Sequence, residues 1–120
     1  MSNENLKQRT KRFALRVIKL VESLPSDQTC RILGKQLLRS GTSVGANYRA
    51  ACRSKSPADF ISKMGTVEEE ADESGYWMEL LVEAGKIKSA KLSALMQEAG
   101  ELTAIAVSSI NTARKSPARR

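Results

Sequence analysis

The 120-residue chain contains no histidine, only two cysteines and only five aromatic residues. Without histidine it lacks the side chain that most often acts as a general base or metal ligand near neutral pH. Cys30 and Cys52 are too far apart for a CxxC motif, and we interpret them as free thiols in a reducing compartment. The sequence therefore predicts no metal site, no cofactor and no enzymatic activity.

Long apolar runs are also absent. The segment from Met1 to Thr10 is polar and lacks the apolar core of a signal peptide. No stretch approaches the roughly 20 apolar residues that cross a bilayer. We expect a cytoplasmic protein with no membrane partner and no small-molecule substrate.

The scarcity of aromatic residues leaves aliphatic side chains and alanine to fill a core, which favours helices over strands. Apolar residues recur at spacings of three and four in four segments, about 5–23, 27–53, 56–84 and 89–113. Ser26 and Ser56 are candidate N-caps, and Gly85 is expected just past the third segment. The pattern predicts one all-α domain over residues 1–113, an antiparallel up-and-down four-helix bundle with a kinked second helix. Residues 114–120 are predicted to be a basic, disordered tail.

The kink is expected at residues 40–45, SGTSVG, because this segment is poor in residues that favour helices. Glycine costs about 1 kcal/mol relative to alanine inside a helix. Gly41 and Gly45 have two other interpretations. They allow another helix to approach closely, or they open a helix start where an anion binds.

Charged residues are segregated along the chain. Residues 1–55 contain twelve Lys or Arg and three acids, whereas residues 56–85 contain eight acids and a single lysine. The simplest interpretation is that the acidic third helix matches basic helices of the same or a neighbouring subunit. A metal or acid–base site in the acidic run 68–73 has little support, because the di-iron pattern of such bundles needs histidine.

The densest basic run without acids lies on the second expected helix. Arg31, Lys35 and Arg39 follow one another at intervals of four, and Arg49 and Arg53 continue the series. Such a stripe can follow phosphate groups, since arginine binds them bidentately. We predict these five residues to contact nucleic acid, with help from the tail residues Arg114, Lys115, Arg119 and Arg120. A solvated face without a ligand is the alternative.

Three stretches carry a resemblance to a known family: LRSGTSVGANYR at 38–49, KSPADF at 55–60 and EEEADES at 68–74. The sequence resembles the bacterial four-helix bundle proteins encoded within intervening sequences of large-subunit ribosomal RNA genes, also called S23 ribosomal proteins. The likeness is most specific at R-S-x-x-S-V-x-A-N-Y-R. It places Arg39, Ser43, Asn47 and Arg49 at family-motif positions, with an expected role in the helix kink and in subunit contacts.

The resemblance also implies partners. It implies a homo-oligomer, typically a pentameric ring, and relatives that bind nucleic acid and a reverse transcriptase. Two hypotheses follow for this chain. It is a basic oligomer that contacts RNA, DNA or a nucleoprotein, or it is a structural or protein-interaction ring with no nucleic-acid role.

Overall fold

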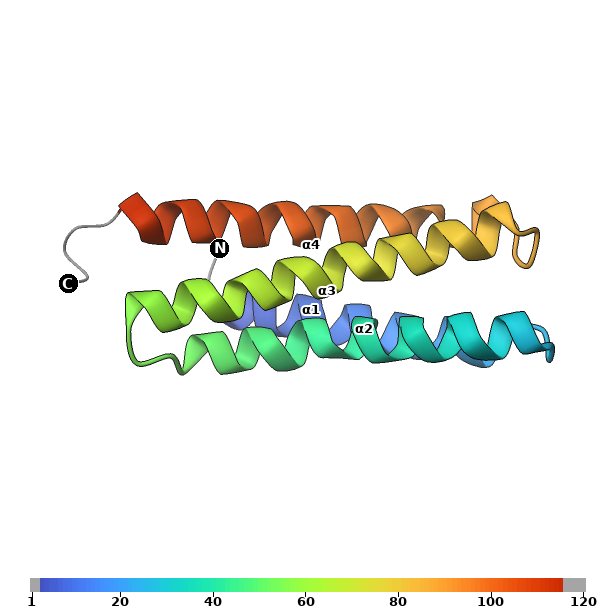
Figure 1. The fold of residues 1–120 in the computed structure, drawn as a ribbon, viewed down its shortest axis with the longest axis horizontal. Helices are drawn as coiled ribbons and strands as arrows, with labels where there is room; N and C mark the ends of the chain where they lie inside the picture. The colour runs from blue at the N-terminus through green and yellow to red at the C-terminus, as the bar shows by residue number, and fades with distance from the viewer. Residues whose placement is uncertain (1–2, 116–120) are drawn as a thin grey trace.

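A computed structural model describes residues 3–115 of the chain. Within this range it contains four α-helices and no strand: α1 (Asn3–Glu22), α2 (Gln28–Cys52), α3 (Pro57–Glu83) and α4 (Ser89–Lys115). Neighbouring helices run antiparallel and form an elongated bundle of 52 × 20 × 19 Å (Figure 1). The prediction of an all-α, up-and-down four-helix bundle is confirmed.

The helix ends follow the local sequence, with one correction. The Ser56 side chain accepts a hydrogen bond from the Asp59 backbone N–H at 3.0 Å, as expected for an N-cap. Gly85 has a φ of 74° just past α3, a conformation that glycine adopts without steric cost. The N-cap of α2 is Asp27 rather than Ser26, because the Asp27 carboxylate accepts from the Cys30 N–H at 2.7 Å.

The core consists of aliphatic side chains at helical spacing. Each helix contributes one inward stripe, as the three-and-four pattern predicts. The largest fully buried apolar side chains are Phe13, Val17, Leu37, Val44, Met64, Met78, Leu81, Leu92 and Leu102. The apolar spacing predicted for the third and fourth segments is therefore confirmed in the buried faces of α3 and α4.

The second helix does not break. One helix of 25 residues runs through the segment 40–45, and Figure 1 shows it as a continuous ribbon. The low helix propensity of this segment was expected to kink or break the helix, and it does not break it, because packing against α1 outweighs that propensity. A Cβ on Gly41 would lie 2.8 Å from Cγ2 of Val17, and one on Gly45 would lie 3.2 Å from Oγ1 of Thr10. The two glycines thus allow α1 and α2 to approach closely.

The fourth helix extends slightly further than expected. It includes Arg114 and Lys115, which were predicted to belong to the tail, and both side chains are exposed. Helix ends commonly fray, and the last residue of a helix is assigned differently by one or two positions. The remaining predicted tail residues, 116–120, lie outside the described residues.

Candidate nucleic-acid interface

The outward face of α2 is basic. Arg31, Lys35, Arg49 and Arg53 are all exposed, and α2 itself contains no Asp or Glu. At 100° per residue these four side chains fall within one sector of the helix, and they span about 33 Å along its axis at 1.5 Å per residue. We call these four residues the α2 stripe.

No described carboxylate neutralises the α2 stripe. Among the side chains of residues 5–115, none pairs with any of its four members. The acids of the chain are concentrated on α3, where they serve other residues or remain at the surface. The stripe therefore presents its full positive charge to solvent.

Arg39, the fifth predicted contact, is placed differently. It points toward α3, where its Nη1 donates to Oε1 of Glu70 at 3.1 Å and its Nη2 pairs with Glu73. Glu73 is held in turn by Trp77, whose Nε1 donates to Oε2 at 3.0 Å. The structure thus assigns Arg39 a role in joining α2 to α3 and leaves the α2 stripe with four members.

A buried hydroxyl pair lies next to this ion pair. The Ser74 hydroxyl donates to the Ser40 hydroxyl at 2.9 Å, and both side chains are fully buried. Because each polar group has a partner, burying the pair costs little and fixes which residues of α2 and α3 face each other. The motif segment 39–49 therefore sets the register between these two helices.

Two further motif residues stabilise α2 internally. The Ser43 hydroxyl donates to the Arg39 carbonyl at 2.8 Å, and the Asn47 amide donates to the Ser43 carbonyl at 2.8 Å. Both hydrogen bonds lie within the regular helix α2. Arg49, the fourth motif residue, is exposed and belongs to the α2 stripe.

Sequence reasoning missed a second basic surface on α1. Leu15 is 55% exposed, the highest value among the large apolar side chains of the described residues. Its helical neighbours Lys11, Arg12 and Lys19 are exposed and form no ion pair within residues 3–115. We call these four residues the α1 surface. The sequence does contain a signal for this surface, because Leu15 is an apolar residue outside the apolar stripe of its helix.

Another basic residue of α1, Arg9, is neutralised. Arg9 reaches α4 and donates from Nε to Glu98 at 2.7 Å, from Nη2 to Glu98 at 2.9 Å and from Nη2 to Glu101 at 2.5 Å. The hydrogen bond from Arg9 lowers the pKa of Glu98, and the charges of Arg16 and Arg12 act in the same direction. Glu98 therefore stays ionised and ties α4 to α1.

The acidic run of α3 does not form a metal centre. Glu70 and Glu73 pair with Arg39, while Glu69 and Asp72 are exposed. Within residues 3–115, no group of three or more His, Cys, Asp or Glu is arranged to hold a metal ion. The contacts of Arg39 with Glu70 and Glu73 show that part of the segregated charge joins α2 to α3.

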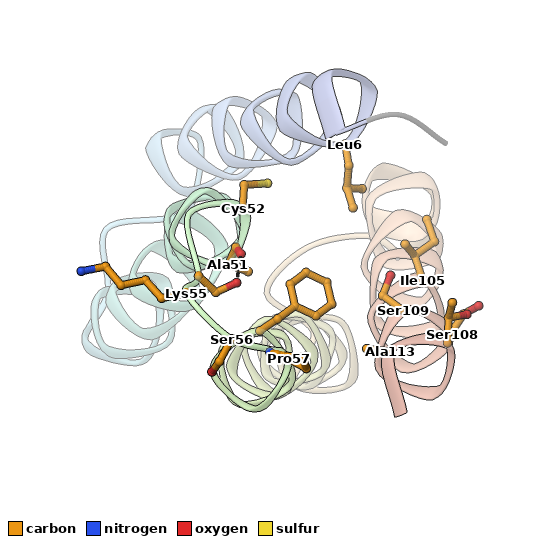
Figure 2. A pocket seen from close by; sticks show the side chains of 13 residues that line it. Leu6, Ala51, Cys52, Lys55, Ser56, Pro57, Ile105, Ser108, Ser109 and Ala113 are labelled. Atoms are coloured by element: carbon orange, nitrogen blue, oxygen red, sulfur yellow. Dashed lines mark hydrogen bonds between the residues drawn. The ribbon is translucent and has the colours of Figure 1, made fainter. Parts of the chain in front are cut away.

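An open cavity lies at the end of the bundle where α1 begins and α4 ends. This open cavity of about 1040 Å³ is lined by apolar side chains and hydroxyls, among them Leu6, Cys52, Ile105 and Ser109 (Figure 2). Lys55 is at its rim, but its amine points away from the hollow. Among the described residues, its lining includes no Asp, Glu or His.

The two thiols occupy opposite ends of α2. Cys30 is buried and Cys52 lines the open cavity, and neither forms a disulfide. Burial raises the pKa of the Cys30 thiol.

None of the described helices is long and apolar enough to span a bilayer.

Comparison with known proteins agrees with this architecture. The model of the family described as 23S rRNA-intervening sequence protein matches residues 3–108. The chain is similar to a solved protein of unknown function from the S23 ribosomal protein family of Bacteroides thetaiotaomicron VPI-5482. That similarity has 36% sequence identity and a TM-score of 0.81, and it covers 87% of this chain and 96% of the other. No curated protein matches the chain.

The match extends over all four helices and includes the motif segment at 39–49. The resemblance predicted from that segment is therefore confirmed. This chain belongs to the 23S rRNA-intervening sequence protein family.

Proposed function

We propose that this protein is a non-catalytic, homo-oligomeric binding protein of the cytoplasm that contacts nucleic acid through the α2 stripe. The observation that carries this proposal is the difference between Arg39 and the other four predicted contacts. Arg39 is neutralised by Glu70 and Glu73, whereas the stripe residues have no carboxylate partner among the described side chains, residues 5–115. An exposed row of unneutralised cations is the arrangement that phosphate backbones bind.

The dimensions of the stripe suit a nucleic-acid duplex. Its length of about 33 Å approaches one turn of B-DNA, about 34–36 Å. The stripe presents two pairs of cations, Arg31 with Lys35 and Arg49 with Arg53, separated by uncharged residues such as Thr42 and Ala46. Contacts to phosphate alone carry no sequence information, so we expect weak sequence preference.

The test is an anisotropy titration of labelled structured RNA and duplex DNA with the purified protein at two salt concentrations. Four phosphate contacts predict a slope of about −3.6 for the logarithm of the duplex association constant against the logarithm of salt concentration. Affinity that does not change between low and moderate salt would contradict the proposal. Light scattering on the same sample reports whether the species that binds is an oligomer.

A second function is favoured by a different observation. Positive charge lies on α1 and α2 and negative charge on α3, and Leu15, Ile32, Leu38 and Tyr76 are exposed apolar or aromatic side chains. Surfaces of opposite charge with apolar centres are typical of protein interfaces. On this reading the protein is a structural or protein-interaction ring without a nucleic-acid role. An oligomer that binds neither RNA nor DNA would favour it.

A further inference from the structure

The open cavity at the end of the bundle lies directly beside the last cation of the α2 stripe. Arg53 is the C-cap of α2, and the connection that follows it, residues 54–57, forms part of the cavity lining. Lys55, in this connection, is exposed, and its amine points away from the cavity on the α2 side (Figure 2). Positive charge therefore continues from the stripe around the end of α2 to the rim of the cavity.

Cations also stand on the α4 side of the cavity. Arg114 and Lys115 follow Ala113, a lining residue of α4, and both are exposed. No described carboxylate pairs with any of the four flanking cations, Arg53, Lys55, Arg114 and Lys115. The cavity is thus flanked on two sides by positive charge, which favours an anionic ligand.

The lining of the cavity combines an aromatic ring, aliphatic side chains and hydroxyl groups. Phe60 of α3 supplies the ring, and Leu6 of α1 and Ile105 of α4 supply aliphatic groups. Ser109 and Thr112 of α4 add hydroxyls, which both donate and accept hydrogen bonds. A nucleobase has the matching chemistry, since its faces stack on aromatic rings and its edges form hydrogen bonds. The volume of about 1040 Å³ is ample, because ligand sites commonly measure about 300–1,000 Å³.

We propose that the open cavity receives an unpaired nucleobase of the nucleic acid whose backbone lies on the α2 stripe. This rests on the function proposed above and narrows its ligand to a chain with an unpaired nucleotide beside a duplex. Phosphates contact the stripe and Lys55, and the base that follows them stacks on Phe60 with its edge toward Ser109. Bases inside a duplex are paired and stacked, so only an unpaired or extruded base can enter the cavity.

The experiment compares overhangs with and without bases. Duplexes of RNA and of DNA carry, at the 3′ or the 5′ end, either a short unpaired overhang or an abasic overhang with the same number of phosphates. Because the two overhangs have equal charge, a difference in affinity measures the contribution of the bases. Base–aromatic stacking predicts that the overhang with bases binds at least about fivefold more tightly in an anisotropy titration.

Two variants change the cavity without changing its charge. Phe60→Leu removes the ring and keeps an apolar side chain, and Ser109→Leu replaces a hydroxyl with a larger group that fills the space. Both should lose the preference for bases and should bind the abasic overhang as the wild type does. Ser93→Leu is the matched control on α4, because Ser93 is exposed and does not line the cavity. Circular dichroism checks that each variant is folded.

The two thiols give a second readout, since Cys52 lines the cavity whereas Cys30 is buried. In the free wild type a maleimide should modify Cys52 faster than Cys30. The overhang with bases should slow this reaction more than the abasic overhang does. A Cys52 thiol that reacts no faster than Cys30 would overturn the base site, because another occupant, such as a second copy, would then already cover the cavity.

The affinities separate a failure of the base site from a failure of the α2 stripe. Equal affinity of the wild type for the two overhangs would overturn the base site, and so would a preference that survives in both cavity variants. In either case, duplex binding that weakens in Arg31→Gln would leave the function proposed above intact. Absence of binding to every probe would overturn that function and the base site with it.

Discussion

The Arg9 guanidinium on α1 binds the Glu98 carboxylate on α4 through two hydrogen bonds of 2.7 and 2.9 Å. This pair joins two helices that share few contacts, since α1 packs mainly on α2 and α4 mainly on α3. The side chains of Arg9 and Glu98 are 24% and 15% exposed, so solvent screens the pair only in part. An ion pair thus helps to link the first and last helices.

Arg9→Gln should lower the free energy of unfolding by about 1–2 kcal/mol, because it leaves a partly buried carboxylate with a weaker donor. Lys11→Gln is the control, since Lys11 is exposed and forms no ion pair with the described side chains, residues 5–115. Urea unfolding of the two variants beside the wild type measures the difference. Equal losses in both variants would argue against a specific link.

The same pair has a predicted pH dependence. Arg9 lowers the pKa of Glu98 below its ordinary value of 4.5. A carboxylate with a lowered pKa stabilises the fold above its unfolded-state pKa, and this contribution is lost as the pH falls through the folded-state pKa. The stability difference between wild type and Arg9→Gln should therefore be full near neutral pH and shrink in acid below pH 4.5. A difference that stays constant over this range would contradict the assigned cause.

Substitutions of Arg39 and Arg31 should have different effects, the first on stability and the second on nucleic-acid binding. Arg39→Gln removes the ion pairs to Glu70 and Glu73, and we expect a loss of about 0.5–1 kcal/mol because Arg39 is half exposed. Arg31→Gln removes a side chain with no carboxylate partner and should leave stability unchanged within about 0.5 kcal/mol. We expect Arg31→Gln to reduce nucleic-acid affinity instead. Thermal unfolding and anisotropy titration of both variants measure the two effects. Lower affinity in Arg39→Gln with unchanged affinity in Arg31→Gln would contradict the assignment.

Gly41 should not tolerate alanine, although alanine favours helices. The added methyl would lie 2.8 Å from Cγ2 of Val17, a fully buried side chain that is stiff at χ1. The cost of such overpacking, about 1–3 kcal/mol, is expected to exceed the propensity gain of about 1 kcal/mol. Gly65→Ala is the control, because nothing lies within 4 Å of its added Cβ, and it should stabilise the fold. Denaturant midpoints of the two variants measure the contrast.

The fold was largely predictable because it depends on signals that are local in sequence. Ser56 and Gly85 mark the ends of α3, and apolar spacing identifies the buried faces. The unbroken α2 was not predictable in this way. Propensity at Gly41 and Gly45 is a local quantity, whereas the close approach of Val17 and Thr10 that favours glycine there is a property of the packed helices.

The candidate site was predictable only in part for the same reason. Arg31, Lys35 and Arg39 are equivalent by sequence spacing, yet only Arg39 reaches the carboxylates of α3. The distinction depends on which side of α2 faces α3, and the buried contact of Ser40 with Ser74 fixes that side.

The most direct test of the account is the salt dependence of duplex binding in Arg49→Gln with Arg53→Gln, compared with Lys88→Gln with Lys91→Gln. Both variants lose two exposed cations, but the first pair belongs to the α2 stripe and the second lies at the opposite end of the bundle (Figure 1). The account predicts that the first variant's salt slope shrinks by about 1.8, while the control keeps the wild-type slope. Equal slopes in the two variants would contradict the α2 stripe as the nucleic-acid interface.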